Sequence, residues 1–408
     1  MNAVTQRPGQ RVAGHASAQT RFYAGLDRGL LTAVAILLCF GLVMVESASI
    51  PVAERQLGQP FYYLERQALY AVFGLLLGAV VVRIRLVYWE KTGLALLLFA
   101  CFLLLLVLIP GVGVDINGGM RWLNLRLFKV QVSEPARLFV LIYLAGYLVR
   151  HGEQVRASAW GFVKPMIVLS LLCLLLLMEP DFGASAVLLA TALGMMYLSG
   201  VRLWRFALLL LLTVAVLAVL VVASPYRLER LTTFMNPWAH PYHSGFQLTQ
   251  SLIAIGRGGL FGVGLGGSIL KLFYLPEAPT DFLFAIIAEE LGLVGIAVVI
   301  GLYAYVVWRA FVIGARAERS GNGFAAYLAY GIGIGIGLQA FINIGVNMGV
   351  LPTKGLTLPL LSYGGSSMLV TCLAVALLLR IGYETRSAVP EPRSRAPAFR
   401  SAGKERRA

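Results

Sequence analysis

Ionisable side chains in this sequence gather at the ends of long apolar segments. They are Glu46, Glu134 with Arg137, Glu179 with Asp181, Asp281, and Glu289 with Glu290. Charged groups inside or beside a membrane segment are costly, so they are candidates for function. A proton pump would more often need a carboxylate near the middle of the membrane, whereas most of these groups lie near one end of their segments. Their placement favours chemistry at the outer face of a membrane over transport across it.

Asp281 begins an apolar segment in the order Pro279-Thr280-Asp281-Phe282. The N-terminus of a helix at this point would lower the pKa of the carboxyl group and hold it ionised, and the apolar neighbours would limit the access of water. A carboxylate in such a place suits a general base. Asp is also a favoured residue for capping the N-terminus of a helix. The residues alone leave both interpretations open.

Two further groups of charged residues admit both a structural and a functional interpretation. Glu289 lies eight residues further along the chain, about 12 Å deeper along a helix. There it either supports the site or is satisfied inside the helical bundle. Glu134 and Arg137 are three residues apart and share one helical face. They either form a local ion pair or offer a guanidinium group that can bind phosphate.

Three other patterns are not expected to carry chemistry. The run Gly262-Val-Gly-Leu-Gly-Gly267 matches the GxGxxG spelling of dinucleotide sites, but no strand–helix unit surrounds it. Its glycines are expected to allow either close approach of the backbone or simply re-entrant packing. His240 and His243 have no third ligand nearby, so no metal site is predicted. Asp181 is expected to cap the helix that follows it.

The composition indicates a membrane protein. Of the 408 residues, 59% are hydrophobic and only 13% are charged, against about 25% charged in soluble domains. A membrane-spanning helix needs roughly 20 apolar residues. Ten such spans are predicted, with uncertain ends: 29–48, 68–83, 92–110, 135–150, 163–178, 182–199, 204–223, 281–308, 325–349 and 357–381. The expected fold class is an all-α polytopic membrane protein with ten transmembrane helices. The four cysteines all lie in apolar segments, so no disulfide is predicted.

The net charge of +15 is better explained by membrane orientation than by nucleic-acid binding. With both termini in the cytoplasm, the inner segments carry 23 of the 34 Lys and Arg, and the outer segments carry 11. Acidic residues divide the other way, with 7 in the inner segments and 12 in the outer segments or within the spans. An excess of Lys and Arg in short cytoplasmic loops is the usual signal of orientation. Both termini are therefore predicted to be cytoplasmic, and no nucleic-acid partner is expected.

Two outer connections are long. Residues 111–134 join the third and fourth spans, and residues 224–280 form a large loop between the seventh and eighth. Long loops in compact proteins are usually functional or disordered, and the aromatic content of the second favours an ordered loop lying on the membrane. Chemistry is therefore expected on the outer face. Residues 1–28 and 384–408 are expected to be disordered basic cytoplasmic tails around one domain, 29–383, without a cleaved signal peptide.

Several long motifs occur in a fixed order. They are Asn236-Pro-Trp238, Gly245-Phe-Gln-Leu-Thr-Gln-Ser251, Tyr274-Leu-Pro-Glu-Ala-Pro-Thr-Asp281 with the following Phe282–Glu290, and Met348-Gly-Val-Leu-Pro-Thr-Lys354-Gly-Leu-Thr-Leu-Pro359-Leu-Leu-Ser362-Tyr363-Gly364-Gly365-Ser366-Ser367. These motifs resemble the signature of the SEDS family (shape, elongation, division and sporulation proteins), and the similarity runs through residues 25–386. The last motif is more similar to the division member of the family than to the elongation member.

The resemblance implies a ten-span fold and a peptidoglycan glycosyltransferase. Members of this family polymerise lipid II into glycan strands and release undecaprenyl diphosphate. The implied location is the bacterial inner membrane at the division septum, with the active site facing the periplasm. Asp281 matches the essential Asp of the family and is implied to be the catalytic carboxylate. Implied substrate contacts are Glu134, Arg137, Arg121, Lys354, Ser366 and Ser367, with Glu289 in a supporting role.

One position departs from the family pattern. SEDS proteins usually have Lys three residues after the Glu, where this chain has Arg137 after Glu134. Arg keeps the positive charge but is bulkier and binds phosphate differently. The departing diphosphate needs charge neutralisation, which Arg137, Arg121, Lys354 or a divalent cation such as Mg could supply. The sequence itself requires no cofactor.

The resemblance also implies a partner. This is a class B penicillin-binding transpeptidase of the FtsI type, together with other proteins of the divisome. Gly345 and Gly349 in the ninth span have a spacing that lets helices approach closely. They either pack inside the bundle or receive the single transmembrane helix of the partner, near spans eight and nine.

Two other functions stay open. A lipid II flippase would be a transporter, and transporters often show inverted repeats and broken helices. Neither is detected in the sequence. A non-catalytic scaffold that recruits a transpeptidase would leave Asp281 free to vary.

Overall fold

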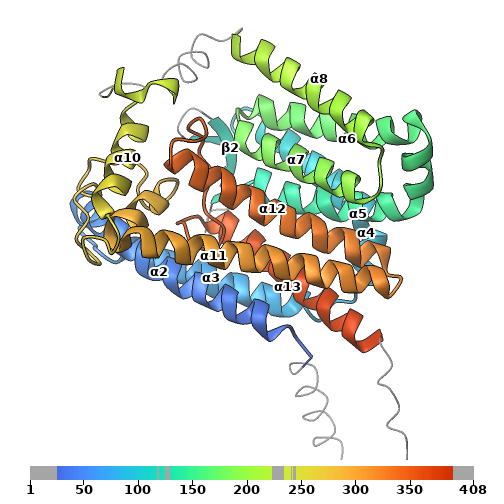
Figure 1. Cartoon of the computed structure of the whole chain (residues 1–408), viewed down its shortest axis with the longest axis horizontal. Helices are drawn as coiled ribbons and strands as arrows, with labels where there is room; N and C mark the ends of the chain where they lie inside the picture. Colours follow the sequence, from blue (N-terminus) through green and yellow to red (C-terminus); the bar gives the residue numbers. More distant parts are fainter. Residues whose placement is uncertain are drawn as a thin grey trace, which may run out of the picture.

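The computed structural model describes residues 25–116, 119–124, 129–222, 234–239, 241 and 245–388, and most of them are helical (Figure 1). The helices are α2 (Arg28–Leu57), α3 (Tyr62–Val81), α4 (Leu86–Val107), α5 (Ser133–Ala157), α6 (Ala159–Met178), α7 (Phe182–Leu198), α8 (Leu203–Val222), α10 (Phe246–Gly258), α11 (Leu283–Arg319), α12 (Gly323–Asn347) and α13 (Gly365–Ala388), with the short 3-10 helix η1 (Pro237–Ala239).

Each of the ten predicted spans overlaps one of these helices, although residues 357–364 of the tenth span lie before α13 and are not helical. Within the described ranges, seven helices are long and apolar enough to cross a membrane, namely α2, α3, α4, α6, α11, α12 and α13. Helix α7 is apolar but has only 17 residues. The predicted polytopic helical fold is therefore confirmed, whereas the count of ten spans stays a prediction. The predicted division into one domain and two tails also stays a prediction, because most of both tails lies outside the described residues.

The first long outer connection contains a small sheet that the sequence did not predict. Strands β1 (Gly113–Ile116), β2 (Gly119–Asn124) and β3 (Lys129–Gln131) form an antiparallel sheet in the order β1-β2-β3. In its register, Trp122 pairs with Val114 on one side and with Gln131 on the other. The strands are short, so alternation of polar and apolar residues gives little signal.

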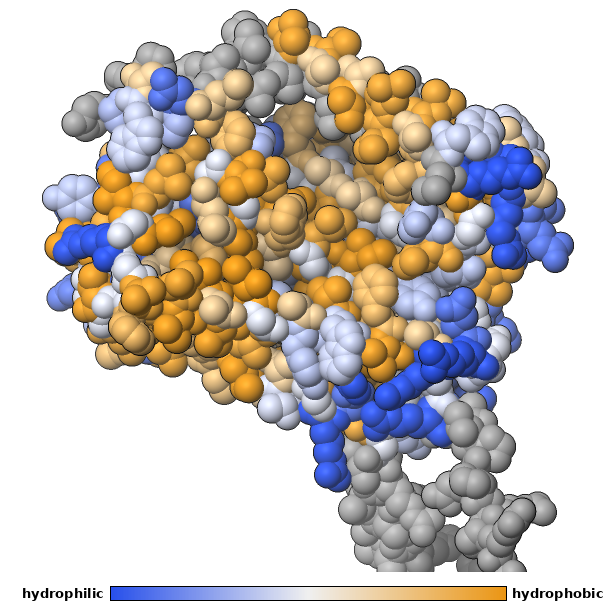
Figure 2. Space-filling view, in the orientation of Figure 1, coloured by the Kyte–Doolittle hydropathy of each residue, from blue (hydrophilic) through white to orange (hydrophobic). Residues whose placement is uncertain are grey.

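The helices pack as a bundle in which distant segments of the chain are neighbours. Helix α11 packs along α12, α3 along α13, and α4 along α5, while α8 lies at the edge against α7 (Figure 1). Leu69, Phe73 and Leu98 on α3 and α4 are more than half exposed. Large apolar side chains on the outside of a helical bundle are expected where lipid covers the protein. Figure 2 shows apolar residues over much of the face in view and hydrophilic ones gathered beside the start of α12 and the end of α13.

Both ends of the described chain lie at the same end of the bundle. The Asp27 carboxylate precedes α2 and pairs with Arg386 on α13 at 3.1 Å, and also with Arg309 on α11. A chain whose two ends lie on the same side of a membrane crosses it an even number of times, so this arrangement agrees with the predicted even number of spans. Because neighbouring helices alternate in direction, the starts of α11 and α13 and the ends of α6 and α12 meet at the opposite end.

Helix α11 is broken near its start. Gly292 has a φ of 63°, in the left-handed region, which favours glycine. Main-chain hydrogen bonds join residues 259–264 to residues 289–294 across the break. A Cβ on Gly262 would lie 2.1 Å from the carbonyl oxygen of Glu290, so the two segments are in close contact. Gly262 of the GxGxxG run therefore serves close backbone approach, which is one of the two roles expected for these glycines. No broken helix was detected in the sequence, whereas the structure has one at Gly292.

Candidate active site

The segment between α12 and α13, residues 348–364, folds back among the helices. Its Leu358 and Leu361 are almost fully buried. Backbone carbonyls in an irregular buried segment need hydrogen-bond partners, and side chains of three helices supply them. These bonds run from Gln67 to the Ser362 carbonyl (3.0 Å), from Tyr303 to the Pro359 carbonyl (2.6 Å) and from Gln339 to the Thr357 carbonyl (3.0 Å). The helices thus fix the course of this segment.

Asp281 lies in the turn before α11 and faces residues 348–364. A Cβ on Gly355 would lie 3.0 Å from Asp281 Oδ2, so the carboxylate is directly beside this glycine. It does not cap α11. Phe282 holds the N-cap position without a side-chain hydrogen bond, and the Ala285 amide donates to Asn347 Oδ1 at 3.2 Å. The alternative interpretation of Asp281 as an N-cap is therefore wrong.

The surroundings of Asp281 favour its protonated form. Burial raises the pKa of this carboxyl group to about 7, and the negative charge of Glu277 adds to the rise. The positive charge of Arg121 lowers the pKa of Asp281, and the negative charge of Asp181 raises it. The predicted lowering by the helix N-terminus is wrong, because the loss of water outweighs the favourable charges. A pKa near neutral pH allows the group to accept and then release a proton.

Arg121 brings a positive charge to this site from β2. Its charge lowers the pKa of both Asp281 and Glu179. Within the described residues, its guanidinium group forms no ion pair, and its buried Nε has no hydrogen-bond partner. The side chain is partly exposed and lies over Gly119, where an added Cβ would be 2.6 Å from the Arg121 Nε. An anion could therefore bind Arg121 without displacing a carboxylate partner.

Asp181 ties three segments together around the site. Its carboxylate accepts a hydrogen bond from the Ala184 amide at 3.0 Å and so caps α7, as predicted. It also accepts from Ser133 at 2.8 Å and from Gln131 at 3.2 Å. The backbone amide of Gln131 donates to the hydroxyl oxygen of Ser366 at 2.8 Å. The turn between α6 and α7, the sheet and the start of α13 are thereby joined.

The predicted substrate contacts of the last motif differ in their exposure. Ser366 and Ser367 are buried, and the Thr357 hydroxyl donates to Ser367 Oγ at 3.0 Å. Their hydroxyls thus hold neighbouring segments of the protein. Lys354 is partly exposed, and its ammonium group lies 4.9 Å from the centre of the Phe182 ring. Contact of any of these three residues with substrate stays a prediction.

Glu179 lies in the turn between α6 and α7 and is a fully buried acid. Neither of its carboxyl oxygens has a hydrogen-bond partner in the described chain. Burial raises the pKa of Glu179 to about 8, the negative charge of Asp181 adds to the rise, and Arg121 opposes it. Glu179 is therefore mainly neutral at pH 7, which avoids a third negative charge beside Asp181 and Asp281.

Glu134 and Arg137 form an ion pair at 2.5 Å on the first turn of α5, and both are buried. They line a cavity of about 60 Å³ between α5, α7, α12 and α13. That volume holds a few water molecules at most, far less than a lipid-linked sugar. Because the guanidinium group already has a carboxylate partner, the structure favours the local ion pair over phosphate binding. Asp281 does not line this cavity.

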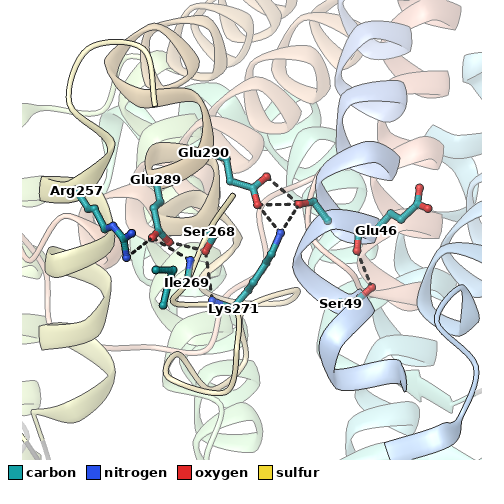
Figure 3. Close-up of polar contacts among 9 residues, drawn as sticks. Glu46, Ser49, Arg257, Ser268, Ile269, Lys271, Glu289 and Glu290 are labelled. Carbon is teal, nitrogen blue, oxygen red and sulfur yellow. Dashed lines mark hydrogen bonds and ion pairs between the residues drawn. The ribbon is translucent and has the colours of Figure 1, made fainter. Parts of the chain in front are cut away.

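Glu289 and Glu290 hold the segment between α10 and α11 at the break in α11 (Figure 3). Glu289 accepts hydrogen bonds from the Ser268 hydroxyl and the Ile269 amide and lies 3.7 Å from Arg257. Glu290 accepts from Ser47 on α2 at 2.8 Å and pairs with Lys271 at 2.7 Å. Both carboxylates are fully buried, so their charges are compensated by these partners. A supporting role of Glu289 therefore concerns the loop before Asp281.

In the described parts of the chain, no three His, Cys, Asp or Glu side chains lie where they could hold a metal ion together. His240 and His243 lie outside the described residues. A divalent cation at the site stays a prediction, and most of its ligands would have to come from the substrate.

Sequence reasoning missed Asn343 and Asn347, which are almost fully buried near the end of α12. Both donate to the carbonyl oxygen of Asp281, at 2.8 and 3.0 Å. The available signal was a polar stripe in an apolar span: Gln339, Asn343 and Asn347 recur every four residues on one helical face.

Comparisons with known proteins agree with this structure. The family described as "Cell cycle protein", FtsW/RodA/SpoVE, matches residues 28–387. A relative from Thioalkalivibrio sulfidiphilus named "Probable peptidoglycan glycosyltransferase FtsW" is 60% identical over 372 residues, which cover 91% of this chain and 93% of the relative. A relative of the same name from Nitrosococcus halophilus is 59% identical over 88% of this chain and 93% of its own.

Solved structures share the fold. A chain from "Structural coordination of polymerization and crosslinking by a peptidoglycan synthase complex" superposes with a TM-score of 0.73 at 29% identity and covers 88% of this chain and 98% of that one. The crystal structure of the rod shape determining protein RodA of Thermus thermophilus gives a TM-score of 0.66 at 28% identity, with 88% and 96% covered. This chain belongs to the FtsW/RodA/SpoVE family of cell cycle proteins.

Proposed function

We propose that this chain, a membrane-embedded peptidoglycan glycosyltransferase of the FtsW type, polymerises lipid II with Asp281 as its general base. The observation that carries the proposal is the state of that carboxylate. Its pKa is raised to about 7, helix capping does not occupy it, and Arg121 lies close enough to influence its charge. The high identity to relatives named as glycosyltransferases supports the same reaction class.

In the proposed reaction, the 4-hydroxyl group of the acceptor GlcNAc gives its proton to the Asp281 carboxylate. The hydroxyl oxygen attacks the anomeric carbon of the MurNAc at the end of the donor chain. A glycosidic C–O bond forms while the C–O bond to the diphosphate breaks, and undecaprenyl diphosphate leaves with the bonding electrons. A fixed positive charge stabilises the negative charge that develops on the leaving group.

Arg121 is the best candidate for that positive charge. Its guanidinium group has no ion-pair partner in the described chain, whereas Arg137 is paired with Glu134 at 2.5 Å. Lys354 offers a second positive charge from residues 348–364. A divalent cation such as Mg would act in the same way, held mainly by the diphosphate oxygens.

The flippase alternative gains no support from the broken helix. In transporters, unwound helices line a cavity with free backbone groups. At Gly292, the backbone groups of the break are bonded to residues 259–264 instead. The break therefore joins the loop before Asp281 to α11 and opens no path across the bundle.

The proposed setting is the bacterial inner membrane at the division septum, with the site facing the periplasm and both termini in the cytoplasm. The proposed partner is an FtsI-type class B transpeptidase. Gly345 and Gly349 face Leu351 and α10 of this same chain, so they are internal packing residues. The transmembrane helix of the partner would instead meet exposed apolar side chains of α11 and α12, among them Trp308 and Phe341.

The test is the substitution Asp281→Asn in the purified full-length chain with its transpeptidase. Because Asn347 caps α11, this nearly isosteric change should keep the unfolding temperature. A general base contributes about 10²–10⁴-fold, so glycan-strand synthesis from lipid II should fall to near background. Asp115 is an exposed carboxylate on β1. The matched control is Asp115→Asn, which should keep normal activity. Normal polymer yield from Asp281→Asn would remove Asp281 from the mechanism.

A further inference from the structure

Two buried asparagines hold the backbone of Asp281. Asn343 and Asn347 lie one turn apart at the end of α12 and are 1% and 0% exposed. Each donates a side-chain hydrogen bond to the same acceptor, the Asp281 carbonyl oxygen, at 2.8 and 3.0 Å. A buried carbonyl has two lone pairs, and here both are used. The backbone of Asp281, two residues before the start of α11, is therefore fixed by α12.

The chemistry of the partners sets the orientation of the Asn347 amide. The Ala285 backbone amide can only donate, and it points to Asn347 Oδ1 at 3.2 Å. The Nδ2 group must then face the Asp281 carbonyl, which can only accept. Asn347 thus caps α11 from outside the helix and clamps Asp281 with the same side chain.

Asn343 also reaches the other side of the Asp281 carboxylate. Its Nδ2 donates to the Leu356 carbonyl as well as to the Asp281 carbonyl. Leu356 follows Gly355, which lies directly against Asp281 Oδ2. The side-chain amide of Asn343 therefore sets the spacing between the backbone of Asp281 and residues 348–364, which flank the Asp281 carboxylate.

We infer that Asn343 and Asn347 are positioning residues for the transferase reaction. They hold the Asp281 carboxylate at the point where it can take the proton of the acceptor hydroxyl. This inference rests on the proposed role of Asp281. A misplacement of about 1 Å can reduce a rate roughly 10²-fold. In the described part of the chain, no backbone amide of α11, which begins at Leu283, donates to the Asp281 carbonyl.

Gln339 provides a matched control on the same helical face. It lies one turn before Asn343 and donates to the Thr357 carbonyl at 3.0 Å, but it makes no bond to Asp281. Gln339→Ala and Asn343→Ala each remove a side-chain hydrogen bond to residues 348–364. Only Asn343→Ala also removes one of the two hydrogen bonds to the Asp281 carbonyl, while the bond from Asn347 remains. A purely structural role predicts similar losses of stability and activity in both variants.

The experiment measures lipid II polymerisation by the full-length chain with its transpeptidase, at varied lipid II concentration and pH. We expect Asn343→Ala to lower kcat at least about 10-fold with little change in KM, and Gln339→Ala to lower it less than about threefold at a similar unfolding temperature. Asn347→Asp keeps an acceptor for the Ala285 amide and so keeps the cap. The variant loses the side-chain donor to the Asp281 carbonyl and adds a negative charge. That charge should raise the pKa of Asp281 and so move the acid limb of the pH profile to higher pH.

Equal effects of Asn343→Ala and Gln339→Ala on kcat would overturn the inference, and so would an unchanged pH profile of Asn347→Asp. If Asn343→Ala does not fold, Asn347→Asp decides alone. Failure of the proposed general base and failure of the positioning role give different results. Activity of Asp281→Asn would refute the proposed general base, whereas inactive Asp281→Asn with fully active asparagine variants would refute only the positioning role. In an Asp281→Asn background, Asn343→Ala should cause no further loss.

Discussion

At the scale of single residues, the balance of charges around Asp281 decides how it can act. Two negative groups, Glu277 and Asp181, raise its pKa beyond the effect of burial, and Arg121 lowers it. A substrate diphosphate bound at Arg121 would weaken that lowering. Asp281 would then hold a proton more firmly once the acceptor hydroxyl has given it up, as a general base should.

Glu277→Gln tests this balance. Glu277 is exposed and accepts a hydrogen bond from Thr280 at 2.7 Å, which Gln can also accept. Removing its negative charge lowers the pKa of Asp281, so more of the carboxylate is ionised below pH 7. The acid limb of kcat against pH should therefore move to lower pH, by less than about one unit, because exposed charges interact weakly. A shift to higher pH, or none, would show that Asp281 does not govern this limb.

The sequence indicated Asp281, Arg121 and Lys354 through motif resemblance, and the structure brings the segments that carry them to one end of the bundle. It could not indicate the ionisation state of Asp281, because burial by residues 348–364 is a tertiary property. Asn343 was missed for a related reason: a polar residue in an apolar span shows that a partner exists but not which one.

At the scale of elements, the break in α11 connects the large outer loop to the bundle. Residues 259–264 lie against the broken turn, and Glu289 and Glu290 bind the following part of the loop (Figure 3). The pattern of glycines predicted close backbone contact here. It did not predict the break, since Gly292 in an apolar run is equally compatible with an unbroken helix.

Gly262→Ala and Gly264→Ala separate close contact from backbone strain. Both glycines have a positive φ, 78° and 95°, so each alanine costs about 1–2 kcal/mol. Only the Gly262 Cβ would collide with α11, at 2.1 Å from the Glu290 carbonyl, whereas nothing lies within 4 Å of a Cβ on Gly264. Gly262→Ala should therefore lower the unfolding temperature clearly more than Gly264→Ala, measured by thermal unfolding in detergent. Equal shifts would mean that the loop moves away from α11 at no cost.

At the scale of the whole molecule, charge and hydropathy in the sequence predict the direction in which the chain crosses the membrane. The apolar segments predicted every long helix, because the membrane requires each of them to satisfy its own backbone. The small sheet and the fold of residues 348–364 were not predicted. They depend on side chains such as Gln67 and Gln131 that meet the backbone across large separations in sequence.

The predicted orientation can be tested with single cysteines in a variant without the four native ones. Met235 before η1 and Ser320 between α11 and α12 are both exposed. They lie on opposite sides of α11, whose segment after Gly292 has 27 residues, about 40 Å of helix and enough to cross the roughly 30 Å apolar layer. An impermeant thiol reagent added to intact spheroplasts should label Met235→Cys, and Ser320→Cys only after lysis. The Lys and Arg excess requires this order, because short basic loops stay in the cytoplasm. Labelling of Ser320→Cys alone in intact cells would reverse the topology and put Asp281 on the cytoplasmic side, where the proposed site could not face the periplasm.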